Sequence, residues 1–242
     1  YLKRLLGVSA DVDYLTVLGH DQFSDQETKY IKAEEIGSGG IRRTALRAVG
    51  LYAINIDDNG ERTFSYWRDS SAARLLFQLD EDFTTLTEYD LIYFSGISLA
   101  ILPDDIRCKL LNFLKKRSPE LKVAFDSNYR PNLWESKKIA QKSIKRAFMC
   151  SDIALPSLDD ELDLLELKTE NEVNGWFSNM NIPQTVLKRG PSGPRLIGTV
   201  TLDCKFPSLQ NVTDSTAAGD SFNAGFLASY LMGYSIYDSA RH

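Results

Sequence analysis

A run of small residues with one carboxylate stands where an apolar helix is predicted to begin. Residues 212–225 read Val-Thr-Asp-Ser-Thr-Ala-Ala-Gly-Asp-Ser-Phe-Asn-Ala-Gly and lead into the apolar run 226–232. The small side chains of 217–219 let three backbone N–H groups converge at the helix N-terminus, where the helix dipole adds positive potential. The pattern predicts an anion site, with Asp220 in the first helical turn beside it.

A carboxylate beside an anion site is typical of phosphoryl transfer. In such a site an Asp accepts the proton of the attacking hydroxyl, while backbone donors stabilise charge on the transferred group. The predicted catalytic group is therefore Ala217, Ala218, Gly219 and Asp220. The alternative is that Asp214 and Asp220 only cap the helix, a role that Asp fills well.

Two arginines suggest the charge of the substrate. Arg68 follows a predicted hairpin and Arg130 follows a predicted strand, so both could reach a pocket. Guanidinium groups match the geometry of carboxylates and phosphates, and buried cations need such partners. We therefore assign one arginine to the nucleotide phosphates and one to an acidic substrate. The alternative is that both are solvated surface residues.

Composition favours a small-molecule partner. A chain of 242 residues with 43% hydrophobic content can form one large α/β domain, with or without a small accessory sheet. Its net charge of −5 offers no basic field for nucleic acid, and no apolar run is long enough to span a membrane. We expect a cytoplasmic protein with no nucleic-acid or membrane partner. Because the sequence begins inside one predicted helix and stops inside another, we also expect it to be truncated at both ends.

The elements that position these residues alternate after residue 70. Apolar strands are predicted at 91–95, 122–126 and 153–155, with helices at 104–116 and 136–149. This rhythm predicts a parallel sheet covered by helices on both faces, with ligands bound beyond the carboxyl ends of the strands. The segments 126–130, 156–160 and 188–190 fall at such ends.

The first third of the chain has a weaker pattern. Residues 14–18 predict a core strand, and residues 26–48 predict a loop. The runs 50–56 and 62–68 flank Asp57-Asp-Asn-Gly60, whose Asn-Gly pair favours a tight turn, so 50–68 is predicted to form a flap hairpin. Its edges could pair between subunits, giving a homodimer.

The segment Asp-Ser-Thr-Ala-Ala-Gly-Asp-Ser-Phe at 214–222 resembles the second signature of the ribokinase-like, PfkB-type carbohydrate kinases. The resemblance extends over nearly the whole chain and is weakest at 25–50. It implies one kinase domain over 1–242, a three-layer α/β/α domain with a small β-sheet flap (lid). It implies that Asp220 is the general base, that 217–219 form the anion hole, and that Asp214 organises a cation and the nucleotide loop. Glycine is more usual in the family where Ala217 stands.

The same resemblance implies ATP and Mg²⁺ as cofactors and leaves a monovalent cation open. The segment Lys188-Arg-Gly-Pro-Ser-Gly193 resembles the family's nucleotide loop. Ser157 and Asp160 stand where the family has an Asn-x-x-Glu magnesium motif, so Asp160 is the candidate metal residue, with Glu161 as its substitute. The alternative is an acidic start to a solvated helix. The expected nucleotide-binding residues are Asn128, Arg130, Ser157, Lys188, Gly190, Gly193, Ala217, Ala218 and Gly219.

The flap and one strand end also resemble the members of this family that phosphorylate the 6-hydroxyl of a keto-acid sugar. The resemblance lies in Gly50-Leu-Tyr, Tyr66-Trp-Arg68 and 126–134. It implies a substrate site made of Tyr52, Tyr66, Arg68, Arg130 and Asp220, with Arg68 facing the carboxylate. A kinase for a neutral sugar such as fructose or ribose remains an alternative, as does a non-catalytic sugar or nucleotide sensor. A nicotinamide dehydrogenase is disfavoured because no Gly-x-Gly-x-x-Gly motif opens a βα unit.

Overall fold

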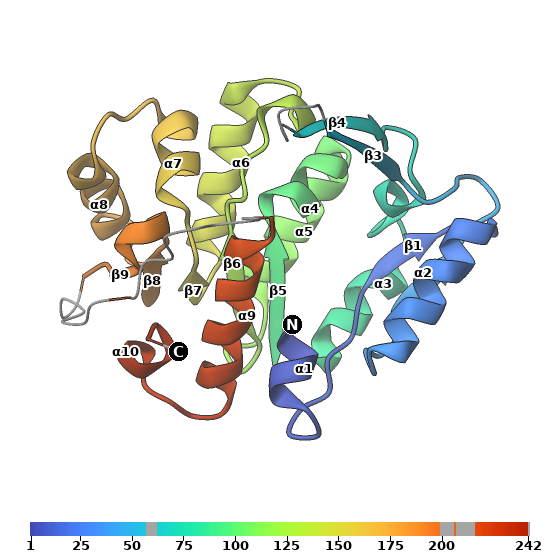
Figure 1. The fold of residues 1–242 in the computed structure, drawn as a ribbon, viewed down its shortest axis with the longest axis horizontal. Coiled ribbons are helices and arrows are strands. Elements are labelled where there is room, and N and C mark those ends of the chain that lie inside the picture. The colour runs from blue at the N-terminus through green and yellow to red at the C-terminus, as the bar shows by residue number, and fades with distance from the viewer. Residues whose placement is uncertain (57–61, 199–205, 207–215, 242) are drawn as a thin grey trace.

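The structure is a computed structural model that describes residues 1–56, 62–198, 206 and 216–241. A five-stranded sheet with the order β5-β6-β7-β8-β9 forms its centre (Figure 1). The first four strands are parallel, as predicted, and β9 is antiparallel to β8. The strands are β5 (Leu91–Ser95), β6 (Lys122–Asp126), β7 (Ile153–Ala154), β8 (Gln184–Leu187) and β9 (Arg195–Leu196).

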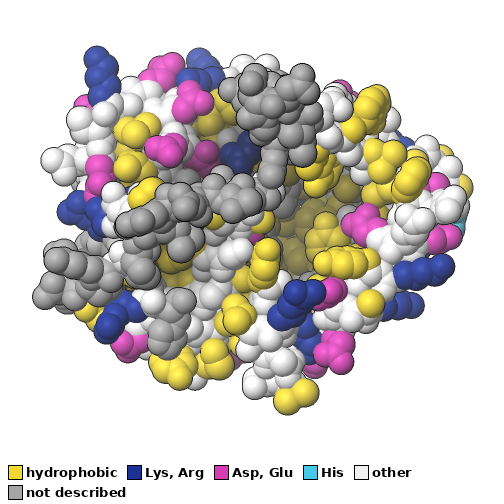
Figure 2. Space-filling model, in the orientation of Figure 1, with side chains coloured by type: hydrophobic (Ala, Val, Ile, Leu, Met, Phe, Trp, Pro, Cys, Tyr) yellow, Lys and Arg dark blue, Asp and Glu magenta, His cyan; other side chains and the backbone are white. Residues whose placement is uncertain are grey.

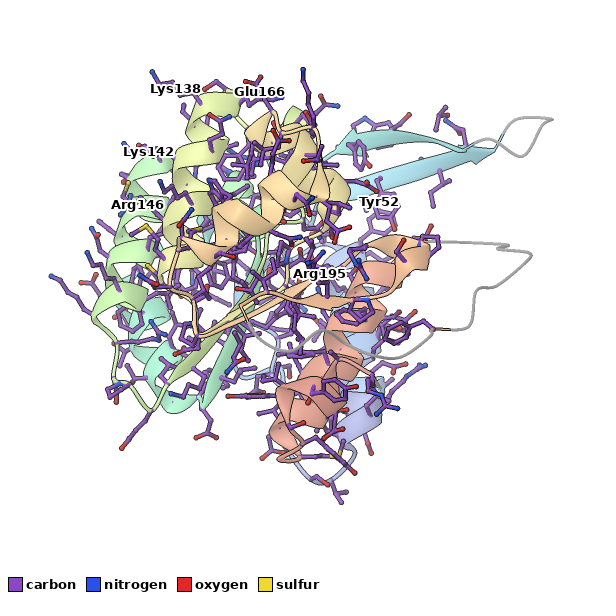
Figure 3. All side chains as sticks on the ribbon, turned by 90° about the vertical axis from the view of Figure 1, so that its left-hand side faces the viewer. Tyr52, Lys138, Lys142, Arg146, Glu166 and Arg195 are labelled. Atoms are coloured by element: carbon purple, nitrogen blue, oxygen red, sulfur yellow. The ribbon has the colours of Figure 1, made fainter. Side chains whose placement is uncertain are left out.

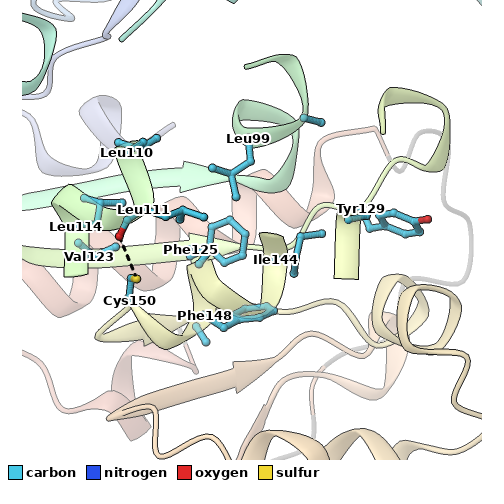
Figure 4. Close-up of a cluster of buried hydrophobic side chains, with 14 of the residues drawn as sticks. Leu99, Leu110, Leu111, Leu114, Val123, Phe125, Tyr129, Ile144, Phe148 and Cys150 are labelled. Atoms are coloured by element: carbon cyan, nitrogen blue, oxygen red, sulfur yellow. Dashed lines mark hydrogen bonds between the residues drawn. The ribbon is translucent and has the colours of Figure 1, made fainter. Parts of the chain in front are cut away.

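Helices cover both faces of this sheet, which confirms the predicted three-layer α/β/α fold. On one face, Phe125 of β6 packs among Leu99, Ile144 and Phe148 (Figure 4). The neighbouring residue Ala124 points to the other face and packs in a second cluster, as the alternation of side chains along a strand requires. The helices of the first face are α4 (Gly96–Ile101), α5 (Asp104–Lys116), α6 (Lys137–Met149), α7 (Leu158–Leu165) and α8 (Glu170–Ser178); those of the second are α1 (Leu2–Leu6), α9 (Ala218–Leu231) and α10 (Ile236–Ser239).

Helix α6 illustrates how these layers form. Its N-terminus is capped by Ser136, whose hydroxyl accepts a hydrogen bond from the Ile139 N–H. One side of the helix buries apolar residues, whereas Lys138, Lys142 and Arg146, spaced four residues apart, lie on the outer side (Figure 3). This amphipathic spacing is why the helix could be predicted from the sequence. Among the described residues, no helix combines the length and the apolarity that crossing a membrane requires.

The prediction of a loop over 26–48 is wrong for 26–33 and 41–43, which lie in a helix and a strand. Helix α2 (Gln22–Ala33) enters this range, and the short strand β2 (Ile41–Arg43) pairs in parallel with β1 (Thr16–Leu18). The helix starts at Asp21, whose side chain accepts from the Ser24 N–H. Only Ser24 and Ile31 are buried, and most of the other residues of this helix are polar, so its composition is that of a solvated loop.

The predicted hairpin is confirmed for the strands that the structure describes. Strand β3 (Leu51–Ile56) pairs antiparallel with β4 (Arg62–Trp67), and the predicted turn lies outside the described residues. Figure 1 shows the hairpin on the side of the molecule from which α9 begins. The remaining described helices are α3 (Asp80–Thr85) and four 3₁₀ turns at Ala72–Leu75, Leu86–Glu88, Pro131–Leu133 and Gly190–Ser192.

Candidate active site

The start of α9 has the geometry of an anion site. Ala217 is the N-cap and takes the left-handed conformation, with φ 60° and ψ 18°. This conformation favours glycine and costs alanine about 1 kcal/mol, which explains why glycine is usual there in the family that the segment resembles. The first N–H groups of a helix have no partner within the helix. Those of the predicted Ala217, Ala218 and Gly219, and that of Asp220, are therefore left by the helix for an anion, and the Asp220 side chain is exposed beside them.

A buried ion pair lies next to this helix start. The Lys188 ammonium donates to Asp126 Oδ2 at 2.5 Å and to Asn223 Oδ1 at 3.1 Å. The amide of Asn223 donates to Asp126 Oδ2 at 2.7 Å and to the Tyr93 hydroxyl at 3.0 Å. These four residues come from β5, β6, the end of β8 and α9, and we call them the lysine network.

The lysine network touches the predicted anion site. A Cβ atom placed on Gly219 would lie 3.8 Å from Lys188 Nζ. The ammonium thus lies beside the first turn of α9, which carries Asp220. Sequence reasoning singled out Lys188 but missed Asn223 and Tyr93. The available signal was the position of Asn223, a polar residue three positions after Asp220 in a helix that is mostly apolar.

The turn after β6 brings two more predicted residues together. Asn128 has a positive φ of 33°, and its N–H donates to Asp126 Oδ1 at 3.0 Å. Asp160 accepts from the Tyr129 N–H at 3.2 Å and from the Arg130 guanidinium at 3.3 Å. Burial raises the pKa of the Asp160 carboxyl, and the charge of Arg130 opposes that rise. Arg130 therefore lies at the strand ends, with the candidate metal residue as its ion-pair partner.

The residues predicted for the nucleotide loop adjoin Lys188. The Lys188 N–H donates to Pro156 O at 2.8 Å, and Lys188 O accepts from the Leu158 N–H at 2.9 Å, so Ser157 lies alongside Lys188. Gly190 and Gly193 have positive φ values of 54° and 73°. A side chain at Gly193 would also collide with the Phe206 ring, 2.2 Å away. Glycine is required there by both conformation and space.

Magnesium is the metal that the family resemblance implies. Within the described residues, no group of three His, Cys, Asp or Glu side chains could form a protein cage for a metal ion. Mg²⁺ usually keeps several waters and binds one or two carboxylates together with nucleotide phosphates. The Asp126 carboxylate lies at the end of β6 and the Asp160 carboxylate in the first turn of α7, so the described residues fit an ion held mainly by phosphates and water.

Three of the predicted sugar-binding residues, Tyr52, Tyr66 and Arg68, lie close together on the flap hairpin. Tyr52 and Tyr66 are directly opposite in the β3–β4 register, with ring centres 6.1 Å apart. The Arg68 guanidinium lies 4.0 Å from the centre of the Tyr66 ring, a cation–π contact. Figure 3 shows Tyr52 projecting from this hairpin. Asp214 lies outside the described residues.

A cavity of about 730 Å³ lies beside the lysine network, between β1 and β5. Figure 2 shows hydrophobic side chains around a hollow in this part of the surface. Ile92, Tyr93 and Phe94 line one side, and Tyr14 and Leu15 line the other. Neither Asp220 nor Lys188 lines this cavity. Tyr93 therefore separates the cavity from the candidate catalytic residues.

Comparisons with known proteins identify the family. The sequence model of the pfkB family carbohydrate kinases matches residues 1–242. The 2-dehydro-3-deoxygluconokinase of Escherichia coli strain K12 is 38% identical over 253 residues, which cover 100% of this chain and 81% of that protein. The protein of the same name from Haemophilus influenzae is 41% identical over 248 residues, which cover 98% of this chain and 78% of that protein. The chain belongs to the pfkB family of carbohydrate kinases. It is a sugar kinase, so the resemblance seen in the sequence is confirmed.

A solved structure supports the same fold. The fructokinase of Vibrio cholerae O395, with fructose, ADP and calcium ion bound, matches this chain with a TM-score of 0.80 at 18% identity. The match covers 98% of this chain and 78% of that chain. The predicted ribokinase-like α/β fold is thereby confirmed.

Proposed function

We propose that this sugar kinase transfers the terminal phosphoryl group of ATP to the 6-hydroxyl of 2-keto-3-deoxygluconate, the compound also named 2-dehydro-3-deoxygluconate. The names of the two relatives support this substrate. The observation that carries the proposal is the flap cluster of Tyr52, Tyr66 and Arg68. It combines a guanidinium, which suits a carboxylate, with two tyrosines that can contact a sugar.

The chemistry in this proposal belongs to the start of α9. Asp220 accepts the proton of the sugar hydroxyl as that oxygen attacks the terminal phosphorus and the bond to ADP breaks. The N–H groups at the start of α9 stabilise the negative charge on the transferred group. The flap excludes water, which limits wasteful hydrolysis of ATP.

The nucleotide in this proposal lies against Lys188, Gly190 and Gly193, with Asn128 and Ser157 at the neighbouring strand ends. The bound ADP and calcium ion of the Vibrio fructokinase support a nucleotide and a cation in the site. Mg²⁺, when bound, would neutralise phosphate charge, with Asp160 holding one of its waters. Arg130 forms an ion pair with Asp160 and so balances its charge.

Arg68→Ala tests the substrate assignment. We expect the KM for 2-keto-3-deoxygluconate to rise about 100-fold or more, because a charge-assisted contact to the carboxylate is lost. The KM for MgATP should stay within about twofold of the wild-type value, since Arg68 is not assigned to the nucleotide. Steady-state kinetics measure both constants.

The matched control is Arg47→Ala, which removes an exposed arginine shortly before the flap. It should leave both constants unchanged. If Arg68→Ala and Arg47→Ala have the same KM for the keto-acid, the substrate is not held by Arg68, and a kinase for a neutral sugar becomes the better assignment.

A homodimer through the flap stays a prediction. Both faces of the hairpin expose apolar side chains: Tyr52 and Tyr66 are 62% and 50% exposed on one face, and Trp67 is 64% exposed on the other. A two-stranded hairpin that exposes apolar residues on both faces is suited to pairing with a second copy. A molecular mass equal to that of one chain, measured by sedimentation equilibrium, would contradict the homodimer.

A further inference from the structure

The lysine network contains a buried ion pair whose presence calls for an explanation. The side chains of Lys188 and Asp126 are only 9% and 4% exposed. Removing two charges from water is costly, and their attraction offsets that cost only with good geometry and additional hydrogen bonds. A gain in folding stability is therefore a poor explanation for this buried ion pair. A need for a fixed positive charge in the active site explains it better.

Asn223 gives this pair its fixed geometry. Its side chain is 1% exposed, its Oδ1 accepts from Lys188, and its Nδ2 donates to both Asp126 and Tyr93. Lys188 can only donate and the Asp126 carboxylate can only accept, so the amide oxygen must face Lys188 and the amide nitrogen must face Asp126. Because Asn223 follows Asp220 by three residues on α9, both lie on the same side of the helix. The amide thus ties the position of the ammonium to the helix that carries the proposed base.

The Lys188 ammonium has a donor left for a ligand. Of its three N–H donors, one goes to Asp126 and one to Asn223 in the described residues. The ammonium also lies beside Gly219, at the 3.8 Å distance given above. No side chain at Gly219 stands between the ammonium and the first turn of α9. An anion bound by the N–H groups of that turn would also contact the ammonium.

Tyr93 closes the network on its outer side. Its hydroxyl accepts from Asn223, and its ring lines the cavity between β1 and β5. Burial, followed by the charge of Asp126, raises the pKa of Tyr93, and Asp220 adds to the rise. The tyrosine is thus a neutral hydrogen-bonding group within the electrostatic reach of both carboxylates.

We propose that Lys188 contacts the phosphoryl group during its transfer, and that Asn223 and Tyr93 are positioning residues that hold the Lys188 ammonium at the start of α9. This inference rests on the proposed function, because it takes the start of α9 as the site of phosphoryl transfer. Lys188 supplies a positive charge that needs no reorganisation as negative charge moves onto the transferred group. Asn223 and Tyr93 act only through Lys188 and Asp126.

Tyr93→Phe tests the positioning role, because it removes one hydroxyl and leaves the ring that lines the cavity. We expect kcat to fall about threefold to tenfold, the range for one hydrogen bond, with the KM values for sugar and MgATP within about twofold of wild type. The matched control is Tyr89→Phe. Tyr89 lines the same cavity, but its hydroxyl interacts with Asp13 and not with the network. A purely structural role would give the two variants equal kcat values, and that result would overturn the inference.

A second pair of variants isolates the ammonium. Lys188→Met alone would leave Asp126 buried without its partner, so it is combined with Asp126→Asn to remove both charges together. We expect kcat of the double variant to fall about 100-fold or more relative to Asp126→Asn alone, because only the single variant keeps the ammonium. Equal kcat values for the two proteins would show that the ammonium does not act on the phosphoryl group.

These tests separate the inference from the proposed substrate. The substrate is tested with the wild-type enzyme. The role of the lysine network is tested by the ratio of kcat between each variant and its control. These kcat values are measured on the full-length protein with the sugar that the wild type converts fastest. Circular dichroism and thermal unfolding confirm that each variant is folded before its kinetics are compared.

Discussion

Asp220→Asn is expected to lower kcat by about 10²–10⁴-fold, the usual contribution of a general base. The amide has nearly the same shape as the carboxylate and can still lie at the start of α9, but it cannot accept the proton of the attacking hydroxyl. The side chain is exposed, so we expect the midpoint of thermal unfolding to change little. Steady-state kinetics with saturating sugar and MgATP measure the loss.

The control for this variant is Asp159→Asn, which removes an exposed carboxylate from the first turn of α7. It changes the net charge by the same amount, and its kcat should equal that of the wild type. If Asp220→Asn keeps kcat within about tenfold of Asp159→Asn, the base assignment is wrong, because a capping role alone predicts so small a loss.

Glu161→Gln is expected to stabilise the folded protein, and the gain should grow as the pH rises. Glu161 is 0% exposed, and within the described residues neither of its carboxyl oxygens has a hydrogen-bond partner. Burial raises its pKa to about 8 from an ordinary value of 4.5, and the charges of the nearby Asp160 and Asp126 add to the rise.

The sign of the effect follows from the two protonation states. Between pH 4.5 and about 8 the folded protein holds a proton on Glu161 that the unfolded chain releases. Wild-type stability therefore falls across this window as the pH rises, and it changes no further above it. Glutamine is neutral throughout, so its advantage should be near zero at pH 4.5 and reach at most about 5 kcal/mol above pH 8, at about 1.4 kcal/mol per pKa unit.

Urea unfolding of both proteins at several pH values measures this difference. Asp159→Asn serves again as the control, since an exposed carboxylate on the same helix should give a small difference that does not vary across the window. A constant difference between Glu161→Gln and wild type from pH 5 to pH 8.5 would mean that Glu161 is ionised in the folded protein.

The sequence predicted those parts of the fold that carry strong periodic patterns. The apolar run of β6 and the capped amphipathic helix α6 lie where the pattern placed them. Helix α2 was not predicted from the sequence, because only Ser24 and Ile31 are buried on it. A helix that buries so few residues is mostly polar, and its composition is close to that of a loop.

The sequence predicted where most residues of the candidate site lie, but not which side chains form hydrogen bonds with one another. Because parallel strands end at one edge of the sheet, Asp126, Asp160 and Lys188 could be expected near one another. The hydrogen bonds of Asn223 to Lys188, Asp126 and Tyr93 could not be read from the sequence, since Tyr93 precedes Asn223 by 130 residues. The left-handed backbone of Ala217 was also hidden, because alanine rarely takes that conformation.

The proposed reaction and its substrate are tested together by ADP release from MgATP by the full-length protein, with 2-keto-3-deoxygluconate, gluconate, fructose and ribose each assayed separately. We expect rapid turnover with 2-keto-3-deoxygluconate and little with the other three. Equal or faster turnover with fructose or ribose would contradict the assignment of an acidic substrate, and no ADP release with any of the four would contradict the proposed reaction itself.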